Sequence, residues 1–232
     1  MKPIDAATQF INEFFPDCQA AVLAGSVVRG EETPTSDLDI VVIQDGLPSA
    51  YRESHVEYGW PIEVFVHTQM SYKDFFNSDA ERGRPSLARM MSEGIVIVDS
   101  GILHRIKGEA DELLRKGPEE WTDSVLQTKR YMLSDLLDDF IGTSDEAEAL
   151  FIANAIAEAA HEFVLRTNGK WIGASKWIVR ALRQYDVYFA DRFLAAFQEF
   201  YKHGEREAVI QIVDEVLEPF GGRLFAGYSI GK

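Results

Sequence analysis

Two aspartates, Asp37 and Asp39, stand two positions apart where an apolar segment of the chain begins. In a β-strand the side chains of residues i and i+2 lie on one face, about 6.5–7 Å apart along the strand. Both carboxylates can then converge on one hard cation or on a closely spaced pair. Carboxylate oxygens are the ligands that Mg²⁺ takes in proteins, together with water and substrate phosphates. The pair therefore predicts a divalent-metal site.

A third acid, Glu63, lies inside another apolar segment, between Ile62 and Val64. Such a carboxylate is costly to bury unless it meets a cation or solvent. If its strand lies beside the strand of Asp37 and Asp39, the three carboxylates can face one another. Glu63 could then bind the metal as a third ligand, or act as the general base that takes a proton from an attacking hydroxyl group. The residues alone leave both roles open.

Gly25 and Ser26 follow the first apolar segment and predict an anion site. A Gly-Ser turn that opens a helix presents backbone N–H groups and a hydroxyl group at the positive end of the helix dipole. Such a site suits the phosphates of a nucleoside triphosphate. Arg29, which would lie one helical turn beyond Ser26, adds positive charge in a half of the chain that has few basic residues.

Each of these features also has an ordinary structural explanation. Asp-x-Asp pairs and Gly-Ser pairs are common in turns, and Glu63 alone could be an acid on an edge strand. The combination is far more specific, because a Gly-Ser turn, a Ser-Asp-x-Asp segment and an acid on the next strand occur in this order. We therefore interpret the set as one functional site.

The hydrophobic pattern predicts the elements that must position this site. Short apolar runs bounded by Gly, Pro or Asp predict strands, and apolar residues at helical spacing predict helices. In the first part of the chain we expect strands over 20–24, 38–43, 61–66 and 95–98, and helices over 4–15 and 85–93. Later helices are expected over 102–115, 119–141, 145–167, 174–184, 186–202 and 206–218, followed by an irregular tail.

This change of pattern near residue 100 predicts two domains, 1–101 and 102–232. The first is expected to be an α+β domain, a small mixed sheet with helices. The second is expected to be an all-α bundle that binds the substrate. Short connections between its helices favour antiparallel neighbours.

The motifs of the first domain resemble those of a known enzyme family. The resemblance to the DNA-polymerase-β-like nucleotidyltransferase superfamily rests on three segments, which are Gly25-Ser26-Val27-Val28-Arg29-Gly30, Ser36-Asp37-Leu38-Asp39-Ile40-Val41-Val42 and Ile62-Glu63-Val64. Val28 departs from the alanine that is usual there. The chain looks like the small members with a helical C-terminal domain, such as aminoglycoside adenylyltransferases. The motif resemblance covers residues 20–100, and the helical half is similar in layout only.

The resemblance implies roles for the acids and for the glycine-serine turn. Asp37 and Asp39 would bind two Mg²⁺ ions. Glu63 would occupy the third acidic position, which is a metal ligand in some relatives and a proposed base in others. Gly25 and Ser26 would hold the triphosphate of the nucleotide.

The resemblance also implies a reaction and its substrates. A hydroxyl group of the acceptor would attack the α-phosphate of a nucleoside triphosphate, expected to be ATP, and pyrophosphate would leave. Arg29 matches the Ala-Arg-Gly segment that is common in the family, and we expect it to bind the nucleotide. Related enzymes often bring a basic residue from the second domain to the triphosphate, and Lys176 is the candidate here.

The acceptor is expected to be a small molecule, and an acidic run bears on its charge. Residues 119–148 hold nine acids against Lys129 and Arg130. Such a run is usually a solvated helix face, but in a cleft it would suit a cationic acceptor such as an aminoglycoside. Two alternatives stay open: a protein-modifying nucleotidyltransferase of the antitoxin type, and a non-catalytic nucleotide-binding module.

Composition narrows the class of protein further. The net charge of −15 argues against a nucleic-acid partner, since phosphate backbones need a basic surface. No apolar run approaches the ~20 residues of a membrane helix, and the first residues lack the apolar core of a signal peptide. The single cysteine, Cys18, excludes an internal disulfide. We expect a cytoplasmic protein without a membrane partner, and the oligomeric state is left open.

Overall fold

The computed structural model describes residues 1–231 and divides the chain into two compact units, Met1–Gly117 and Pro118–Lys232. The boundary thus lies after Gly117, whereas the sequence pattern placed it after residue 101. Helix α4 (Leu103–Lys116) causes the difference. Its apolar side is buried in the core beneath the sheet of the first unit, so this helix belongs to that unit.

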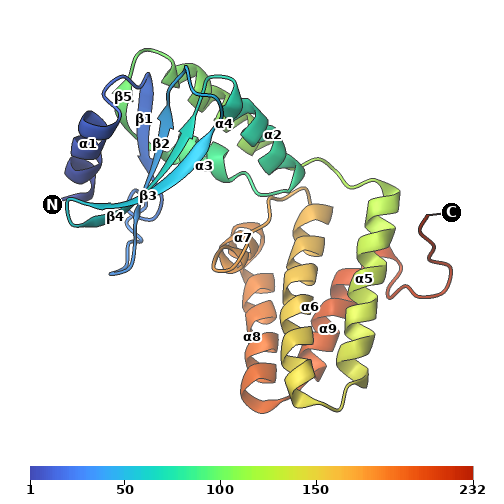
Figure 1. Cartoon of the computed structure of the whole chain (residues 1–232). Helices are drawn as coiled ribbons and strands as arrows, with labels where there is room; N and C mark the ends of the chain where they lie inside the picture. The colour runs from blue at the N-terminus through green and yellow to red at the C-terminus, as the bar shows by residue number, and fades with distance from the viewer. Residues whose placement is uncertain (232) are drawn as a thin grey trace. The chain divides into compact units, whose positions relative to one another are not determined.

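Within the described residues, one five-stranded mixed sheet forms the centre of the first unit (Figure 1). The strand order is β3-β4-β2-β1-β5, and only the pairing of β2 with β4 is parallel. The strands are β1 (Ala20–Ala24), β2 (Leu38–Ile43), β3 (Tyr51–Glu57), β4 (Trp60–His67) and β5 (Ile95–Asp99). The expected mixed sheet and its four expected strands are confirmed.

The fifth strand, β3, was not expected. It lies at the edge of the sheet and most of its side chains are exposed, so the sequence offers no apolar run there. A tight hairpin joins it to β4, with Tyr58 at φ 54° and Gly59 at φ 82°. Two successive residues with positive φ match the right-handed twist of paired strands.

Helices cover both faces of the sheet (Figure 1). Helix α1 (Pro3–Phe14) packs on the face that receives Leu38, Ile40 and Val42 from β2. The opposite face receives Val41 and Ile43, and it is covered by α4 together with α2 (Ser71–Glu81) and α3 (Ser86–Glu93). Because strand side chains alternate, Asp39 belongs to this second face.

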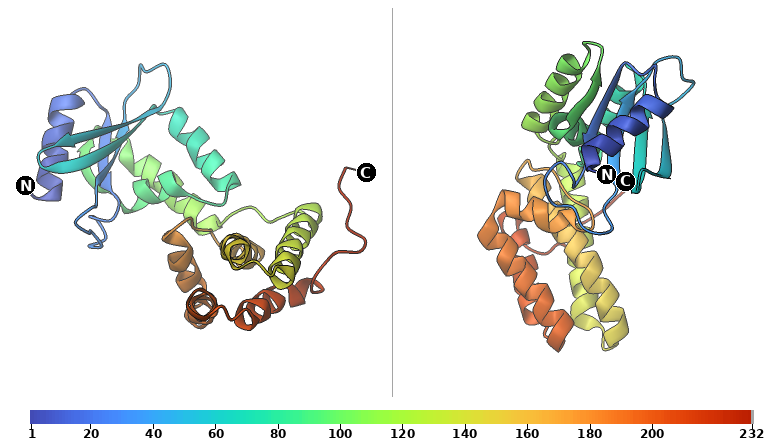
Figure 2. Two further views of the ribbon diagram at one scale, coloured as in Figure 1. Left: turned by 60° about the horizontal axis from the view of Figure 1, so that its bottom comes forward. Right: turned by 90° about the vertical axis from the view of Figure 1, so that its left-hand side faces the viewer.

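The second unit is a helical bundle, as the sequence predicts (Figure 2). Aromatic and aliphatic side chains, among them Phe140, Phe163 and Phe193, fill one core between the helices. Asp145 and Asp186 begin two of the helices by accepting hydrogen bonds from their first backbone N–H groups. The helices are α5 (Asp123–Gly142), α6 (Glu146–Thr167), α7 (Trp177–Tyr185), α8 (Val187–His203) and α9 (Glu207–Leu217), followed by the 3₁₀ turn η1 (Glu218–Phe220).

No helix among residues 1–231 is both long enough and apolar enough to cross a lipid bilayer.

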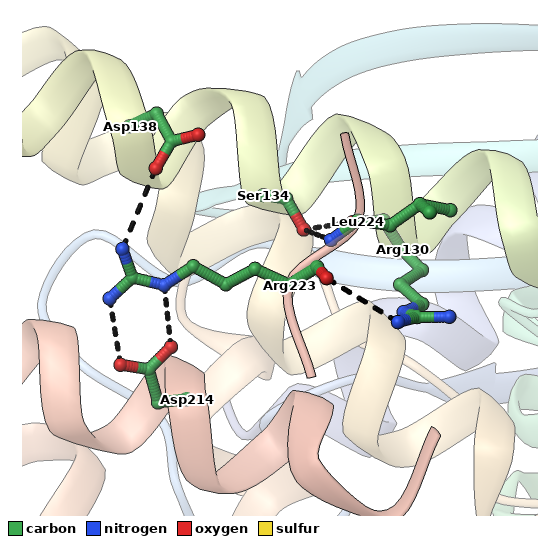
Figure 3. A network of polar contacts seen from close by, with 6 residues as sticks. All are labelled: Arg130, Ser134, Asp138, Asp214, Arg223 and Leu224. Carbon is green, nitrogen blue, oxygen red and sulfur yellow. Dashed lines mark hydrogen bonds and ion pairs between the residues drawn. The ribbon is translucent and has the colours of Figure 1, made fainter. Parts of the chain in front are cut away.

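The tail that follows η1 is irregular, as expected, but α5 holds its backbone (Figure 3). Arg130 donates hydrogen bonds to the carbonyl oxygens of Gly222 (2.7 Å) and Gly221 (2.6 Å). One turn further along α5, the hydroxyl oxygen of Ser134 accepts a hydrogen bond from the backbone N–H of Leu224 (2.9 Å). These contacts satisfy backbone groups that have no partner within a helix or sheet.

Side chains of the tail add a second set of contacts. Arg223 forms ion pairs with Asp214 of α9 (2.7 Å) and Asp138 of α5 (3.5 Å), so that it bridges the two helices (Figure 3). The ring of Tyr228 stacks on the ring of Tyr131, with 4.1 Å between centroids. The tail is therefore a structural part of the bundle.

We predict that Arg130→Ala lowers the free energy of unfolding of the helical unit by about 1–3 kcal/mol, because it leaves tail carbonyl groups without their donor. Arg192→Ala is the matched control: its exposed pair with Glu215 should contribute about 0–1 kcal/mol. Urea unfolding followed by circular dichroism measures both values. Equal losses in the two variants would contradict a structural role for the tail.

Candidate metal centre

The parallel pairing of β2 with β4 brings the predicted acids together. In this register Asp39 lies directly opposite Glu63, and Asp37 precedes β2. One carboxylate oxygen from each of the three residues lies within 4.8 Å of the others. All three side chains are partly buried. The convergence that the sequence suggests is present, while the role of each acid as a ligand stays a prediction.

The surroundings of Asp39 disfavour its negative charge. Its pKa is raised to about 6, first by burial and then by the negative charges of Asp37 and Glu63. The positive charges of Arg29 and Arg52 act in the opposite direction. A compact set of hard oxygen donors with excess negative charge fits a divalent cation such as Mg²⁺.

Gly25 contacts the same carboxylate from the end of β1. Ala24 pairs with Asp39 across the sheet, so the next residue, Gly25, passes beside the Asp39 side chain. A Cβ atom at Gly25 would lie 2.0 Å from Oδ2 of Asp39, and the residue has φ 81°. Only glycine fits both requirements. The structure thus shows a close packing role for Gly25, and its contact with a triphosphate stays a prediction.

The helix expected after Gly25 is absent, and this prediction is wrong. Residues 26–30 form turns, in which the carbonyl oxygen of Ser26 accepts hydrogen bonds from the N–H groups of Arg29 (3.2 Å) and Glu31 (3.0 Å). Gly30, at φ 67°, leaves the helical region and ends the turn. The anion site predicted at Ser26 therefore has no helix dipole behind it.

Ser26 and Arg29 have other partners in this loop. The hydroxyl group of Ser26 donates to Ser36 Oγ (3.1 Å), which ties the turn to the residue before Asp37. Arg29 forms ion pairs with Glu31 and Glu93, each at 3.1 Å. Both residues lie near the acids, and their contacts with a nucleotide stay predictions.

The sequence of this unit matches one known family. Residues 4–89 match the family model described as a nucleotidyltransferase domain. The matched segment contains β1, β2 and β4, and with them all three acids. Residues 4–89 form a nucleotidyltransferase domain. The enzyme class expected from the motifs, a transferase of nucleotidyl groups, is thereby confirmed.

A structural comparison extends beyond this nucleotidyltransferase domain. The crystal structure of a nucleotidyltransferase-like protein from Exiguobacterium sibiricum 255-15 is similar, with a TM-score of 0.50 and 11% sequence identity. The likeness covers 93% of this chain and 74% of that chain. At this identity it concerns the fold alone. No curated protein matches the sequence.

Lys176 is the one predicted nucleotide-binding residue outside the nucleotidyltransferase domain. It stands at the N-terminal end of α7 in the second unit, and its side chain is exposed. The preceding residue, Ser175, has φ 52°, so the chain turns sharply before the helix. The contact of Lys176 with a triphosphate remains a prediction.

Arg52 belongs to no motif in the sequence and was not predicted as a site residue. It extends from edge strand β3 of the nucleotidyltransferase domain and forms an ion pair with Glu63. Its guanidinium group also lies over the ring of Phe65, 4.9 Å from the centroid. The Tyr58-Gly59 pair could have indicated its strand in the sequence, because a hairpin turn before β4 implies a second strand, here β3, on the other side of the turn.

We predict that Gly25→Ala weakens the binding of Mn²⁺ by about tenfold or more, because the new Cβ atom displaces the Asp39 carboxylate. Gly30→Ala is the matched control, since Gly30 has a similar φ of 67° but no atom within 4 Å of the added Cβ. Both variants should lose about 1 kcal/mol of stability. Titration with Mn²⁺ distinguishes them. If Gly25→Ala binds Mn²⁺ as well as Gly30→Ala does, the packing argument is wrong.

Proposed function

We propose that the protein transfers a nucleoside monophosphate, AMP from ATP, to a hydroxyl group of a small acceptor in a Mg²⁺-dependent reaction. The observation that carries this proposal is the acid cluster of Asp37, Asp39 and Glu63. One carboxylate oxygen from each residue lies within 4.8 Å of the others, and the cluster lies inside a segment that matches a nucleotidyltransferase domain. A three-acid cluster of this kind argues against a non-catalytic binding module.

The three carboxylates would hold the metal, with two ions as the family resemblance implies. Bound Mg²⁺ would stabilise negative charge on the attacking and leaving oxygens of the phosphoryl group. The chain itself would position the reactants, which is the main contribution of a protein to phosphoryl transfer. For this purpose we assign the triphosphate to the turn of Gly25 and Ser26.

Two basic residues, Arg29 and Lys176, complete the proposed triphosphate site. The positive charge of Arg29 acts on Asp39, so its guanidinium group lies near enough to influence a phosphate at the acid cluster. Lys176 is exposed, and its assignment rests on the family resemblance. Arg29 forms ion pairs with Glu31 and Glu93. A bound triphosphate would compete with these two carboxylates for the guanidinium group.

Glu63 has two proposed roles in this reaction. As a ligand it would complete the acid cluster, and the proximity of its oxygen to those of Asp37 and Asp39 supports this role. As a general base it would accept the proton of the attacking hydroxyl group. Its position opposite Asp39 on β4 is compatible with both roles.

A cationic acceptor of the aminoglycoside type is the substrate class that we propose. The nine acids of residues 119–148 are all exposed, so their carboxylates are accessible to a positively charged ligand. Both bases in the run already have partners: Lys129 pairs with Glu162, and Arg130 binds the tail. Asp138 pairs with Arg223, so we choose Asp135 and Asp139, which lie one turn apart on α5, as the candidates.

The central test uses labelled ATP, GTP and CTP with Mg²⁺ and a panel of aminoglycosides, lincosamides and proteins. We predict transfer of the AMP group to a small acceptor, and a loss of about a thousandfold or more in Asp37→Asn/Asp39→Asn. Asp74→Asn, an exposed acid on α2, is the control and should keep full activity. Labelling of a protein instead would favour the antitoxin-type alternative. Equal turnover in the double variant would refute the proposed site.

A separate prediction tests the acceptor. Asp135→Asn/Asp139→Asn should raise the KM for a cationic acceptor by about three- to tenfold, because two negative charges are removed from the proposed binding face, and leave the KM for ATP unchanged. The control is Glu158→Gln/Asp191→Asn, which removes two exposed acids from α6 and α8. Initial-rate kinetics measure all values. An unchanged acceptor KM would exclude this face as the acceptor site.

A further inference from the structure

Arg52 is a basic side chain that contacts the acid cluster directly and that neither the motif nor the family match assigns. It belongs to edge strand β3, where it lies opposite Phe65, while Glu63 lies opposite Ser54. Arg52 and Glu63 are therefore diagonal neighbours on the same face of the sheet. Their ion pair joins one acid of the cluster to a residue outside it.

The two partners of this ion pair differ in their exposure to solvent. The side chain of Arg52 is 60% exposed, whereas that of Glu63 is 18% exposed. Exposed ion pairs contribute little to stability, because water screens them and the long side chain loses freedom when it is fixed. Because Arg52 is largely exposed, its guanidinium group can leave Glu63 at a small cost when another cation takes its place there. Its guanidinium group also lies over the Phe65 ring, a favourable contact that does not depend on Glu63.

The charge of Arg52 acts on more than its direct partner. It also reaches Asp39, where it opposes the effects of Asp37 and Glu63. Arg29 also acts on Asp39, and it forms ion pairs with Glu31 and Glu93. Arg52, by contrast, forms an ion pair directly with Glu63, one of the three clustered acids. A divalent cation at the same oxygens carries twice its charge.

We propose that Arg52 is a built-in competitor of the metal: its guanidinium group neutralises Glu63 while the cluster is empty of cations and withdraws when a divalent cation binds. Arg52 thereby lowers the affinity of the site for the cation and stabilises the cluster without it. This inference rests on the proposed function of the three acids as a cation site.

The test is a titration with Mn²⁺ alone, without nucleotide, in which free Mn²⁺ is measured by electron paramagnetic resonance. Arg52→Gln should bind Mn²⁺ about three- to tenfold more tightly than the unmodified protein. Arg52→Lys keeps the charge and should stay within about twofold of the unmodified protein. High salt should reduce the difference, since it screens the arginine charge.

Arg192→Gln is the matched control, because Arg192 is 57% exposed and pairs with a carboxylate, Glu215, in the second unit. It should leave Mn²⁺ affinity unchanged. A thermal melt provides a second readout: without Mn²⁺, Arg52→Gln should melt earlier than the unmodified protein, and saturating Mn²⁺ should raise its midpoint by more. The same melts establish that each variant is folded.

Three outcomes would overturn the inference, and one of them would also overturn the proposed function. If Arg52→Gln binds Mn²⁺ like Arg192→Gln, Arg52 does not compete with the cation. If Arg52→Gln binds Mn²⁺ more weakly, Arg52 positions Glu63 for the metal instead. In both cases the proposed function stands. If the unmodified protein fails to bind Mn²⁺, the cation site and the proposed function fail together with the inference.

Discussion

Mutual repulsion of three carboxylates is the constraint on which the arrangement of the first unit depends. Asp37, Asp39 and Glu63 are held within 4.8 Å of one another, which costs free energy in the absence of a cation. The parallel pairing of β2 with β4 supplies the restraint. Apolar side chains lock its register, because a shift by one residue would turn Glu63 to the opposite face and bury it beneath α1.

Neighbouring features can be understood as responses to this concentration of charge. Gly25 has no side chain, so the backbone can pass beside the Asp39 carboxylate. Ser26 fixes the turn to Ser36, next to the first acid. Arg52 approaches from the edge strand and balances part of the charge at Glu63. A small region thus combines a rigid sheet, a tight loop and one exposed cation.

Local patterns in the sequence were sufficient to predict much of this site. Asp37 and Asp39 are two residues apart at the start of a strand, and Glu63 interrupts an apolar run, so each acid is visible against its neighbours. The edge strand β3 could not be found in this way, because its side chains are mostly exposed and polar. Helix α4 was found, but its packing partner was not, since helical periodicity identifies an apolar side without saying what it packs against. The turn at Ser26 was mistaken for a helix because φ at Gly30 is invisible in the sequence.

The strand order also has a consequence for the way the chain assembles. β3 follows β2 in sequence, yet β4 lies between them in the sheet. The hairpin of β3 and β4 closes over a two-residue turn, and contacts of such short range cost less loop-closure entropy than distant ones. Arg52 and Glu63 belong to that hairpin and can pair within it, ahead of any contact with Asp39. Glu63 can therefore approach the two aspartates with its charge already balanced by Arg52. This ion pair lowers the electrostatic barrier to the docking of the hairpin against β2.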